Sequence, residues 1–356
     1  MESKPQRLDV ARSGLARAAL VSPARLWWIP AALLAAGSAA ADLRGGDPID
    51  IPLFLQASHV LFSTAWLDTF ANPQLQAGPV LIAALGACER LASLIGVSAL
   101  GLVAFVVQLG TVGALMAVVG RLLRHHPGRR WAQLAAGVAL VALGVAHGAY
   151  RDGHPAQVLI PLLWVLAGLD AREGKEVRAG ALIGLSAGLE LWGVLGAAVL
   201  VLGRRRQALT GLGVEAAVVA VLFAPFVLFG DFRMFEYRWL VTEGTLATLV
   251  LERGELFSWP MRLVQAASAL TVGAALAWRL KRSLHAVWAV PLAVVVVRVT
   301  LDPSLNSWYL QAVQTLAIVG AVAILTDKHL RALWRRRRVR PISAEGPAVD
   351  QERIGR

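Results

Sequence analysis

Long apolar stretches separated by short clusters of Arg and Lys constrain the fold of this chain more than any other feature. Residues 96–119 and 208–229 are each apolar over roughly the thickness of a bilayer. The chain is 57% hydrophobic and only 16% charged, whereas soluble domains carry about 25% charged residues. This composition excludes a soluble globular protein. The sequence therefore predicts an all-α polytopic membrane protein.

The basic clusters predict which loops face the cytoplasm, because Lys and Arg accumulate in cytoplasmic loops. Topology thus explains the net charge of +12, which indicates membrane lipids and no nucleic acid as partners. Both termini are predicted to be cytoplasmic, as a basic tail over 1–25 and a second one over 327–356 that is disordered at its end. The remaining clusters lie at 121–130, 172–178, 204–206 and 279–282. This pattern predicts a multi-pass protein of the cell membrane.

The same orientation defines a transmembrane domain over 26–326 with about 8–10 helices. Its first outer loop is 42–92, in which 78–88 is too short to cross and is expected to form an outer-leaflet or re-entrant helix. Residues 179–202 carry basic clusters at both ends, so two half-helices that meet near Glu190 and return to the cytoplasm are expected. Full spans are expected near 26–41, 93–120, 131–149, 156–169, 208–229, 261–279, 284–299 and 308–326.

A polar segment with a regular pattern follows the first span. Asp50 precedes Ile51-Pro52, and an acidic N-cap with Pro in the first turn is typical of a helix start. The spacing that follows predicts an amphipathic helix on the outer membrane surface. Its apolar face, with Phe54 and Leu61, is expected to lie on lipid, and its polar face, with Gln56 and His59, to face a cavity. The alternative interpretation is that Asp50 is only a helix cap and that the helix is only a lid.

Several short motifs resemble those of one family of membrane enzymes. They are Ala-Asn-Pro-Gln-Leu-Gln-Ala-Gly-Pro-Val at 71–80, Gly153-His154-Pro155, the sequence 179–185 with the later Leu191-Trp192, and Leu301-Asp302-Pro303 with Trp308-Tyr309. With the acidic residue and interfacial helix after the first span, they resemble the GT-C-type membrane glycosyltransferases. The resemblance is to their polyprenyl-phosphate-mannose-dependent α-mannosyltransferase branch, common in actinobacteria, and it extends over most of 26–326. Two positions depart from it, at Glu190-Leu191 and around Ala65-Trp66.

The resemblance implies a GT-C-like helix bundle and a hexosyltransferase. Such an enzyme moves a sugar, mannose in this branch, from a polyprenyl-phosphate donor to a lipid or glycan acceptor on the extracytoplasmic face, without a further cofactor. Because a lipid phosphate is already a good leaving group, one carboxylate that takes the proton of the acceptor hydroxyl suffices, and a single attack inverts the anomeric centre. Asp50 is the candidate base, onto which the essential acidic residue of the family maps. Asp42 and Asp47 are its competitors.

The leaving phosphate needs cations or hydrogen-bond donors. The candidates are His154, Arg151, Arg233, Arg238 and Arg298. For the arginines, a lipid head group or a neighbouring carboxylate is the alternative partner. Candidate acceptor-binding or cavity-lining residues are Gln56, His59, Gln76, Asp302 and Tyr309. No cluster predicts a metal ion, and the single Cys88 excludes an intramolecular disulfide.

A transporter or lipid flippase is the main alternative function. Such folds often carry interrupted helices at matching places in two halves, and this chain has one interrupted segment, 179–202, without a counterpart. A non-catalytic scaffold with a GT-C-like fold is the third possibility. The sugar, the acceptor, the polyprenyl length and the oligomeric state stay open at this point.

Overall fold

The computed structural model describes residues 28–338 of the chain. The tail predicted over 1–25 and the end of the tail predicted over 327–356 lie outside the described residues. The fold is that of an all-α membrane protein, with one short antiparallel strand pair, β1 (Trp239–Leu240) and β2 (Leu256–Phe257). The α-helices are α2 (Trp28–Asp42), α3 (Ile51–Leu61), α4 (Pro79–Ile95), α5 (Ala99–Leu122), α6 (Arg129–Ala142), α7 (Val145–Arg151), α8 (Ala156–Arg172), α9 (Glu176–Leu189), α10 (Arg205–Phe229), α11 (Trp259–Leu280), α12 (Ala286–Thr300) and α13 (Tyr309–Arg338). The 3-10 helices are η2 (Trp66–Phe70), η3 (Leu191–Leu202), η4 (Met234–Glu236) and η5 (Leu246–Leu249).

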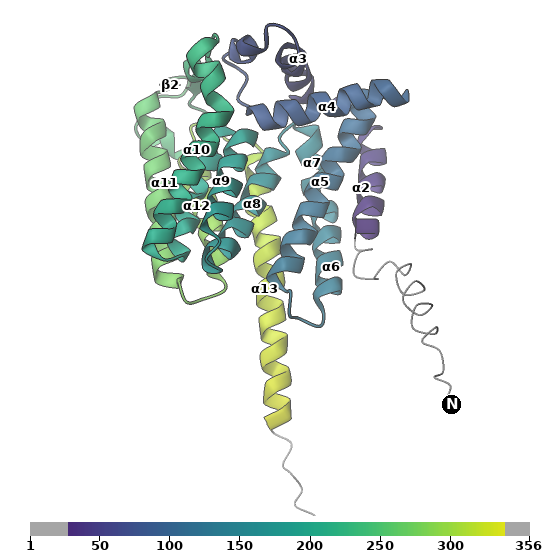
Figure 1. Cartoon of the computed structure of the whole chain (residues 1–356), viewed down its shortest axis with the longest axis vertical. Helices are drawn as coiled ribbons and strands as arrows, with labels where there is room; N and C mark the ends of the chain where they lie inside the picture. The colour runs from purple at the N-terminus through teal and green to yellow at the C-terminus, as the bar shows by residue number, and fades with distance from the viewer. Residues whose placement is uncertain (1–27, 339–356) are drawn as a thin grey trace, which may run out of the picture.

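Four of the described helices are long and apolar enough to cross a membrane: α5, α10, α11 and the part of α13 over Tyr309–Asp327. A fifth span results if α6 and α7, which are bent by 52° at the break between them, count as one. The helices stand side by side in one bundle (Figure 1). The prediction of a membrane protein is confirmed. The count of 8–10 spans and the GT-C-like arrangement stay predictions, because α2, α8, α9 and α12 have only 14 to 17 residues.

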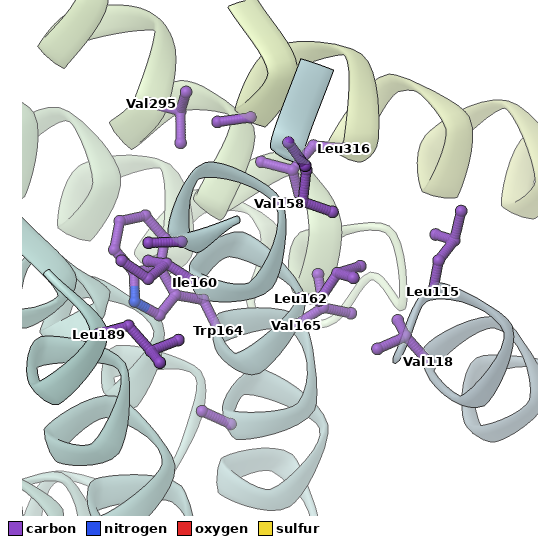
Figure 2. Close-up of a cluster of buried hydrophobic side chains, with 14 of the residues drawn as sticks. Leu115, Val118, Val158, Ile160, Leu162, Trp164, Val165, Leu189, Val295 and Leu316 are labelled. Carbon is purple, nitrogen blue, oxygen red and sulfur yellow. The ribbon is translucent and has the colours of Figure 1, made fainter. Parts of the chain in front are cut away.

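Helix α8 lies in the centre of the bundle. It is apolar on all sides, which is the pattern of a helix surrounded by protein. Trp164 is fully buried, and Figure 2 shows it with Leu162 and Val165 among side chains from neighbouring helices, such as Leu115 of α5 and Leu316 of α13. The Trp164 indole N–H donates to the Ser186 hydroxyl and to the Gly193 carbonyl. The core therefore connects α8 firmly to the segment 179–202.

The segment 179–202 forms a hairpin, as its sequence predicts. Helix α9 ends at Leu189, the backbone of Glu190 is extended, and η3 then runs back along α9. A Cβ at Gly193 would lie 2.3 Å from the Ser186 backbone, so only Gly permits this approach. At the other end, Gly203 lies close to the Ala171 carbonyl. The hairpin begins and ends at the same end of the bundle, and Glu190 forms its tip.

Helices α3 and α4 lie across the opposite end of the bundle, at the top of Figure 1. The expected short helix over 78–88 is part of the longer α4, which continues through Glu89 and Arg90 to Ile95. Helix α4 ends because Gly96 adopts the left-handed conformation (φ 72°) that favours Gly. Ser98 then caps α5 by accepting the Gly101 N–H. The span expected at 93–120 therefore begins at Ala99.

The faces of α3 are opposite to those expected. Phe54 and Ala57 are buried against protein, whereas Gln56 and His59 are exposed. The His59 Nε2 lies 2.7 Å from Glu89 of α4. The apolar face of α3 covers α4 and the bundle end, because the protein itself offers apolar surface to bury there. The prediction that Phe54 anchors α3 in lipid is therefore wrong.

Cysteine accessibility tests the predicted orientation. In a Cys88→Ala background, cysteines at His125 and Lys175 should resist a membrane-impermeant maleimide in intact cells and react after lysis. Cysteines at Asp47 and Glu243 should react in intact cells. All four positions are exposed in the structure, so burial does not explain a difference between the pairs. Labelling of the first pair from outside would contradict the topology derived from the Lys and Arg clusters.

Candidate active site

A cavity of about 850 Å³ lies at the end of the bundle that α3 covers. Such a volume suits a small-molecule or cofactor-sized ligand. Its walls come from the start of α3, the hairpin tip, the start of α11, the end of α12 and the loop before α13. The polar and aromatic residues that line it include Asp50, Gln76, His154, Gln157, Glu190, Trp192, Trp239, Arg262, Arg298, Trp308 and Tyr309.

An imidazole between two carboxylates forms the centre of this cavity. The His154 Nε2 lies 2.8 Å from Asp50 Oδ2, in an ion pair off the axis of a good hydrogen bond. Its Nδ1 lies 3.3 Å from Glu190 Oε1. The other Glu190 oxygen accepts hydrogen bonds from Gln157 Nε2 at 2.9 Å and from Trp192 Nε1 at 2.6 Å. Three segments far apart in the sequence thus meet through charged groups.

Glycines make this meeting possible. Gly153 has a φ of 85°, and a Cβ on it would lie 2.8 Å from the Asp50 Cβ. Gly78 packs on the hairpin tip, where its N–H donates to the Leu189 carbonyl at 2.7 Å. A Cβ on Gly78 would lie 2.3 Å from the Gly188 carbonyl oxygen. The motifs around 78 and 153 therefore serve to bring the chain close to Asp50 and Glu190.

His154 is positively charged at neutral pH. Its burial alone lowers the pKa, but the pairing with Asp50 and Glu190 outweighs burial and raises the pKa of His154 from 6.5 to about 9. The ring also stacks on Trp308, with centroids 4.7 Å apart, and meets the edge of Phe54. An imidazolium in this position holds both carboxylates in place.

The stability of the protein should depend on pH through His154. Because the folded pKa of about 9 exceeds the ordinary 6.5, its stabilisation is complete below pH 6.5 and is lost as the pH rises through 9. The loss is on the order of 3 kcal/mol. Melting temperatures of the purified protein between pH 6 and 9.5 measure it. At pH 6 the melting temperature of His154→Gln should be lower than that of wild type, and it should fall less as the pH rises to 9.5. His125→Gln, at an exposed position, should have the melting temperatures of wild type. An identical decline in His154→Gln and wild type would contradict the assignment.

Arg298 is the one cavity-lining arginine without a carboxylate partner among the described residues. It is only 8% exposed, and its guanidinium lies 4.3 Å from the Trp192 ring centroid and 4.9 Å from that of Tyr309. Its Nη1 is buried and makes no hydrogen bond within the described part of the chain. Arg262 differs, because it pairs with Asp302 at 2.9 Å. Arg298 is therefore the positive charge available to an anion in the cavity.

The structure brings some of the predicted site residues together and leaves others apart. Asp50, His154, Gln76, Arg298 and Tyr309 line the cavity, and Asp302 is buried beside it, where it pairs with Arg262 and accepts a hydrogen bond from Gln265. The remaining predicted residues do not line it. These are Arg151, which donates to the Asp47 and Gly46 carbonyls; Arg233, paired with Glu236; Arg238, which donates to the Phe235 carbonyl; and the exposed Gln56 and His59.

The competitors of Asp50 also lie outside the cavity lining. Asp42 is fully buried, where it contacts His147 and accepts a hydrogen bond from Gln108. Asp47 is exposed on the loop between α2 and α3. Asp50 starts α3 but makes no side-chain capping hydrogen bond, so its carboxylate is directed to His154 instead of the helix end.

Sequence reasoning gave no site role to Gln157, Arg262 or Glu190. Glu190 had a signal, since an ionisable group in the middle of an apolar stretch must face the protein interior or a wet cavity. Arg262 and Gln157 had none, because each lies in an ordinary helix end. Among the described residues, no group of three or more His, Cys, Asp or Glu side chains could hold a metal ion.

Comparison with known proteins adds no relative to these observations. No family model matches the chain, and no curated protein is similar to it. The cavity geometry and the sequence motifs are thus the basis for the function.

Proposed function

We propose that the protein is a membrane glycosyltransferase that moves a sugar, mannose by resemblance, from a polyprenyl-phosphate donor to a lipid or glycan acceptor on the extracytoplasmic face. The observation that carries the proposal is the position of Asp50. Its side chain is 33% exposed, and it lines the same cavity as several aromatic rings and Arg298, which has no carboxylate partner among the described residues. A base, a cation and ring faces are the groups that this transfer requires.

Asp50 has the geometry of a general base. Its Oδ2 pairs with His154, whereas its Oδ1 makes no hydrogen bond or ion pair with a described residue. The pairing orients the carboxylate and leaves one oxygen for the acceptor hydroxyl. Glu190 acts through His154, because it contacts the other ring nitrogen and is itself held by Gln157 and Trp192. Glu190 is a positioning residue in this scheme.

Arg298 provides charge for the leaving group. An arginine can donate two parallel hydrogen bonds to a phosphate, and Arg298 has no carboxylate that competes for it among the described residues. The rings of Trp192 and Tyr309 lie within cation–π distance of the guanidinium and hold it in place without neutralising its charge. This arrangement favours a phosphate-linked donor over a neutral one.

The transfer is a single displacement. The acceptor oxygen forms a bond to the anomeric carbon while the bond from that carbon to the phosphate oxygen breaks. The electron pair of the broken bond stays on the phosphate next to Arg298, and the acceptor proton moves to Asp50 Oδ1. Because attack and departure occur on opposite faces, the anomeric centre inverts.

Sugar transfer by the purified protein tests the proposal. Full-length protein in detergent is incubated with radiolabelled polyprenyl-phosphate mannose and total membrane lipids, and lipid and glycan profiles of cells with and without the protein are compared. The proposal is supported if cells without the protein lack one glycosylated product and the purified protein forms that product in vitro. Movement of the donor lipid between the two leaflets of proteoliposome membranes, without sugar transfer, would favour the flippase alternative.

A further inference from the structure

A second pocket, of about 660 Å³, lies at the end of the bundle opposite to the candidate active site. It is formed by the loop between α5 and α6, the end of α8, the loop between α11 and α12, and α13, at the lower end of the bundle in Figure 1. Helix α8 connects the two ends: it begins just after His154 and ends at Arg172, about 25 Å away for its length. The proposed transfer reaction does not use this pocket.

Positive groups exceed negative ones around the second pocket. Its charged and imidazole lining consists of Arg121, Arg124, Arg172, His125, His126 and His285, with Glu173 and Asp327 as carboxylates. Arg121 and Arg124 both bind Glu173, at 2.9 and 2.8 Å, so one carboxylate serves two guanidinium groups. Arg121 also reaches the buried Asp170, and Asp327 lies 3.6 Å from His285. Lys175 also binds Glu173, and Arg178 also binds Asp170. With these two neighbours, five Arg and Lys side chains meet three carboxylates, so a net positive charge remains.

Arg172 contributes most to this excess. Its Nη1 donates hydrogen bonds to the carbonyls of Lys281 and Ser283, at 2.8 and 2.7 Å, in the loop between α11 and α12. It forms no ion pair with a carboxylate among the described residues. Carbonyl groups fix the guanidinium without neutralising its charge, and the rest of its planar fork stays available for a phosphate.

Apart from the hydroxyl side chains of Ser283 and Thr326, the rest of the pocket lining is apolar. Leu122, Leu123, Leu169, Leu284 and Ala323 complete the walls. A pocket with a basic side and an apolar side matches an amphiphile, with a charged head and an apolar body. Basic pockets between membrane helices on the cytoplasmic side bind phosphate head groups in this manner.

We infer that this pocket binds the phosphate of an anionic phospholipid head group through Arg172 and Arg124, with the leucines against the start of the acyl chains. A soluble phosphate would use the same cations but would not use the apolar side. The site is separate from the proposed transfer reaction, so binding can be measured without it.

Ligand titration of the full-length protein in detergent tests the inference. Native mass spectrometry or thermal shift is recorded with phosphatidylglycerol, with phosphatidylcholine and with inorganic pyrophosphate. Phosphatidylglycerol should bind saturably and more tightly than phosphatidylcholine. Removing one arginine, in Arg124→Gln or Arg172→Gln, should weaken it about 5-fold. Arg124 is 52% exposed, so Arg124→Gln tests the site without the loop contacts of Arg172.

Arg205→Gln is the matched control, because Arg205 is an exposed arginine at the same end of the bundle that does not line the pocket. Its binding of phosphatidylglycerol should equal that of wild type. Equal weakening in Arg205→Gln, or equal affinity for both phospholipids, would overturn the inference. Pyrophosphate binding as tight as that of phosphatidylglycerol, lost in the same two variants, would uphold the phosphate site and assign it to a soluble phosphate.

Discussion

Asp50→Asn is expected to lower sugar transfer by about 10²–10⁴-fold, which is the usual contribution of a general base. The amide has the size of the carboxylate but cannot accept the proton of the acceptor hydroxyl. The start of α3 should persist, since the Asp50 side chain makes no capping hydrogen bond and Asn is as good an N-cap as Asp. Loss of the ion pair with His154 should lower the melting temperature, so rates are compared at a temperature at which both proteins are folded. Initial rates with saturating donor and acceptor measure the effect, because the loss should appear in kcat.

Asp47→Asn is the control for loss of a negative charge on the same loop. Asp47 is exposed and outside the cavity lining, so this variant should transfer sugar at the wild-type rate. If Asp50→Asn turns over normally in a protein whose wild type is active, the base is another group and the enzyme class still stands. If wild type transfers sugar from no polyprenyl-phosphate donor, the proposed function fails as a whole.

Arg298→Gln is expected to lower kcat by about 10²–10³-fold. This is the usual effect of removing one preorganised group that stabilises the charge developing in a transition state. The charge on the phosphate oxygen grows in the transition state, and Arg298 is the cavity arginine without a carboxylate partner in the described structure. Donor binding should weaken as well. Arg298→Lys should recover part of the rate, since Lys keeps the charge but loses the planar fork.

Arg233→Gln is the control for this prediction. Arg233 is an exposed arginine near the same end of the bundle, but it pairs with Glu236 at 2.7 Å and does not line the cavity. Its replacement should leave kcat and KM close to wild type. A loss of rate in Arg233→Gln as large as in Arg298→Gln would mean that general surface charge, and not a placed cation, determines donor use.

The sequence by itself determined the features that depend on local pattern. Apolar stretches of bilayer length, with Arg and Lys between them, determined the membrane class, because burying backbone polar groups in lipid requires helices. Glycines around Glu190 and basic clusters on both sides predicted the hairpin 179–202. Asp50 was a candidate because it precedes Ile51-Pro52 at the start of a helix and because of the family resemblance, and it does line the cavity. Each of these signals lies within a few tens of residues.

Only the tertiary structure decided which side chains share a cavity. The apolar face of α3 was assigned to lipid because periodicity shows that a face is apolar, but not whether lipid or protein covers it. Arg151 and Arg298 were both candidates in the sequence. In the structure Arg151 donates a hydrogen bond to the Asp47 carbonyl, whereas the Arg298 Nη1 makes no hydrogen bond with a described residue. The pairing of His154 with Glu190 joins residues 36 apart across two helices. Such contacts follow from packing of whole helices, which no local pattern encodes.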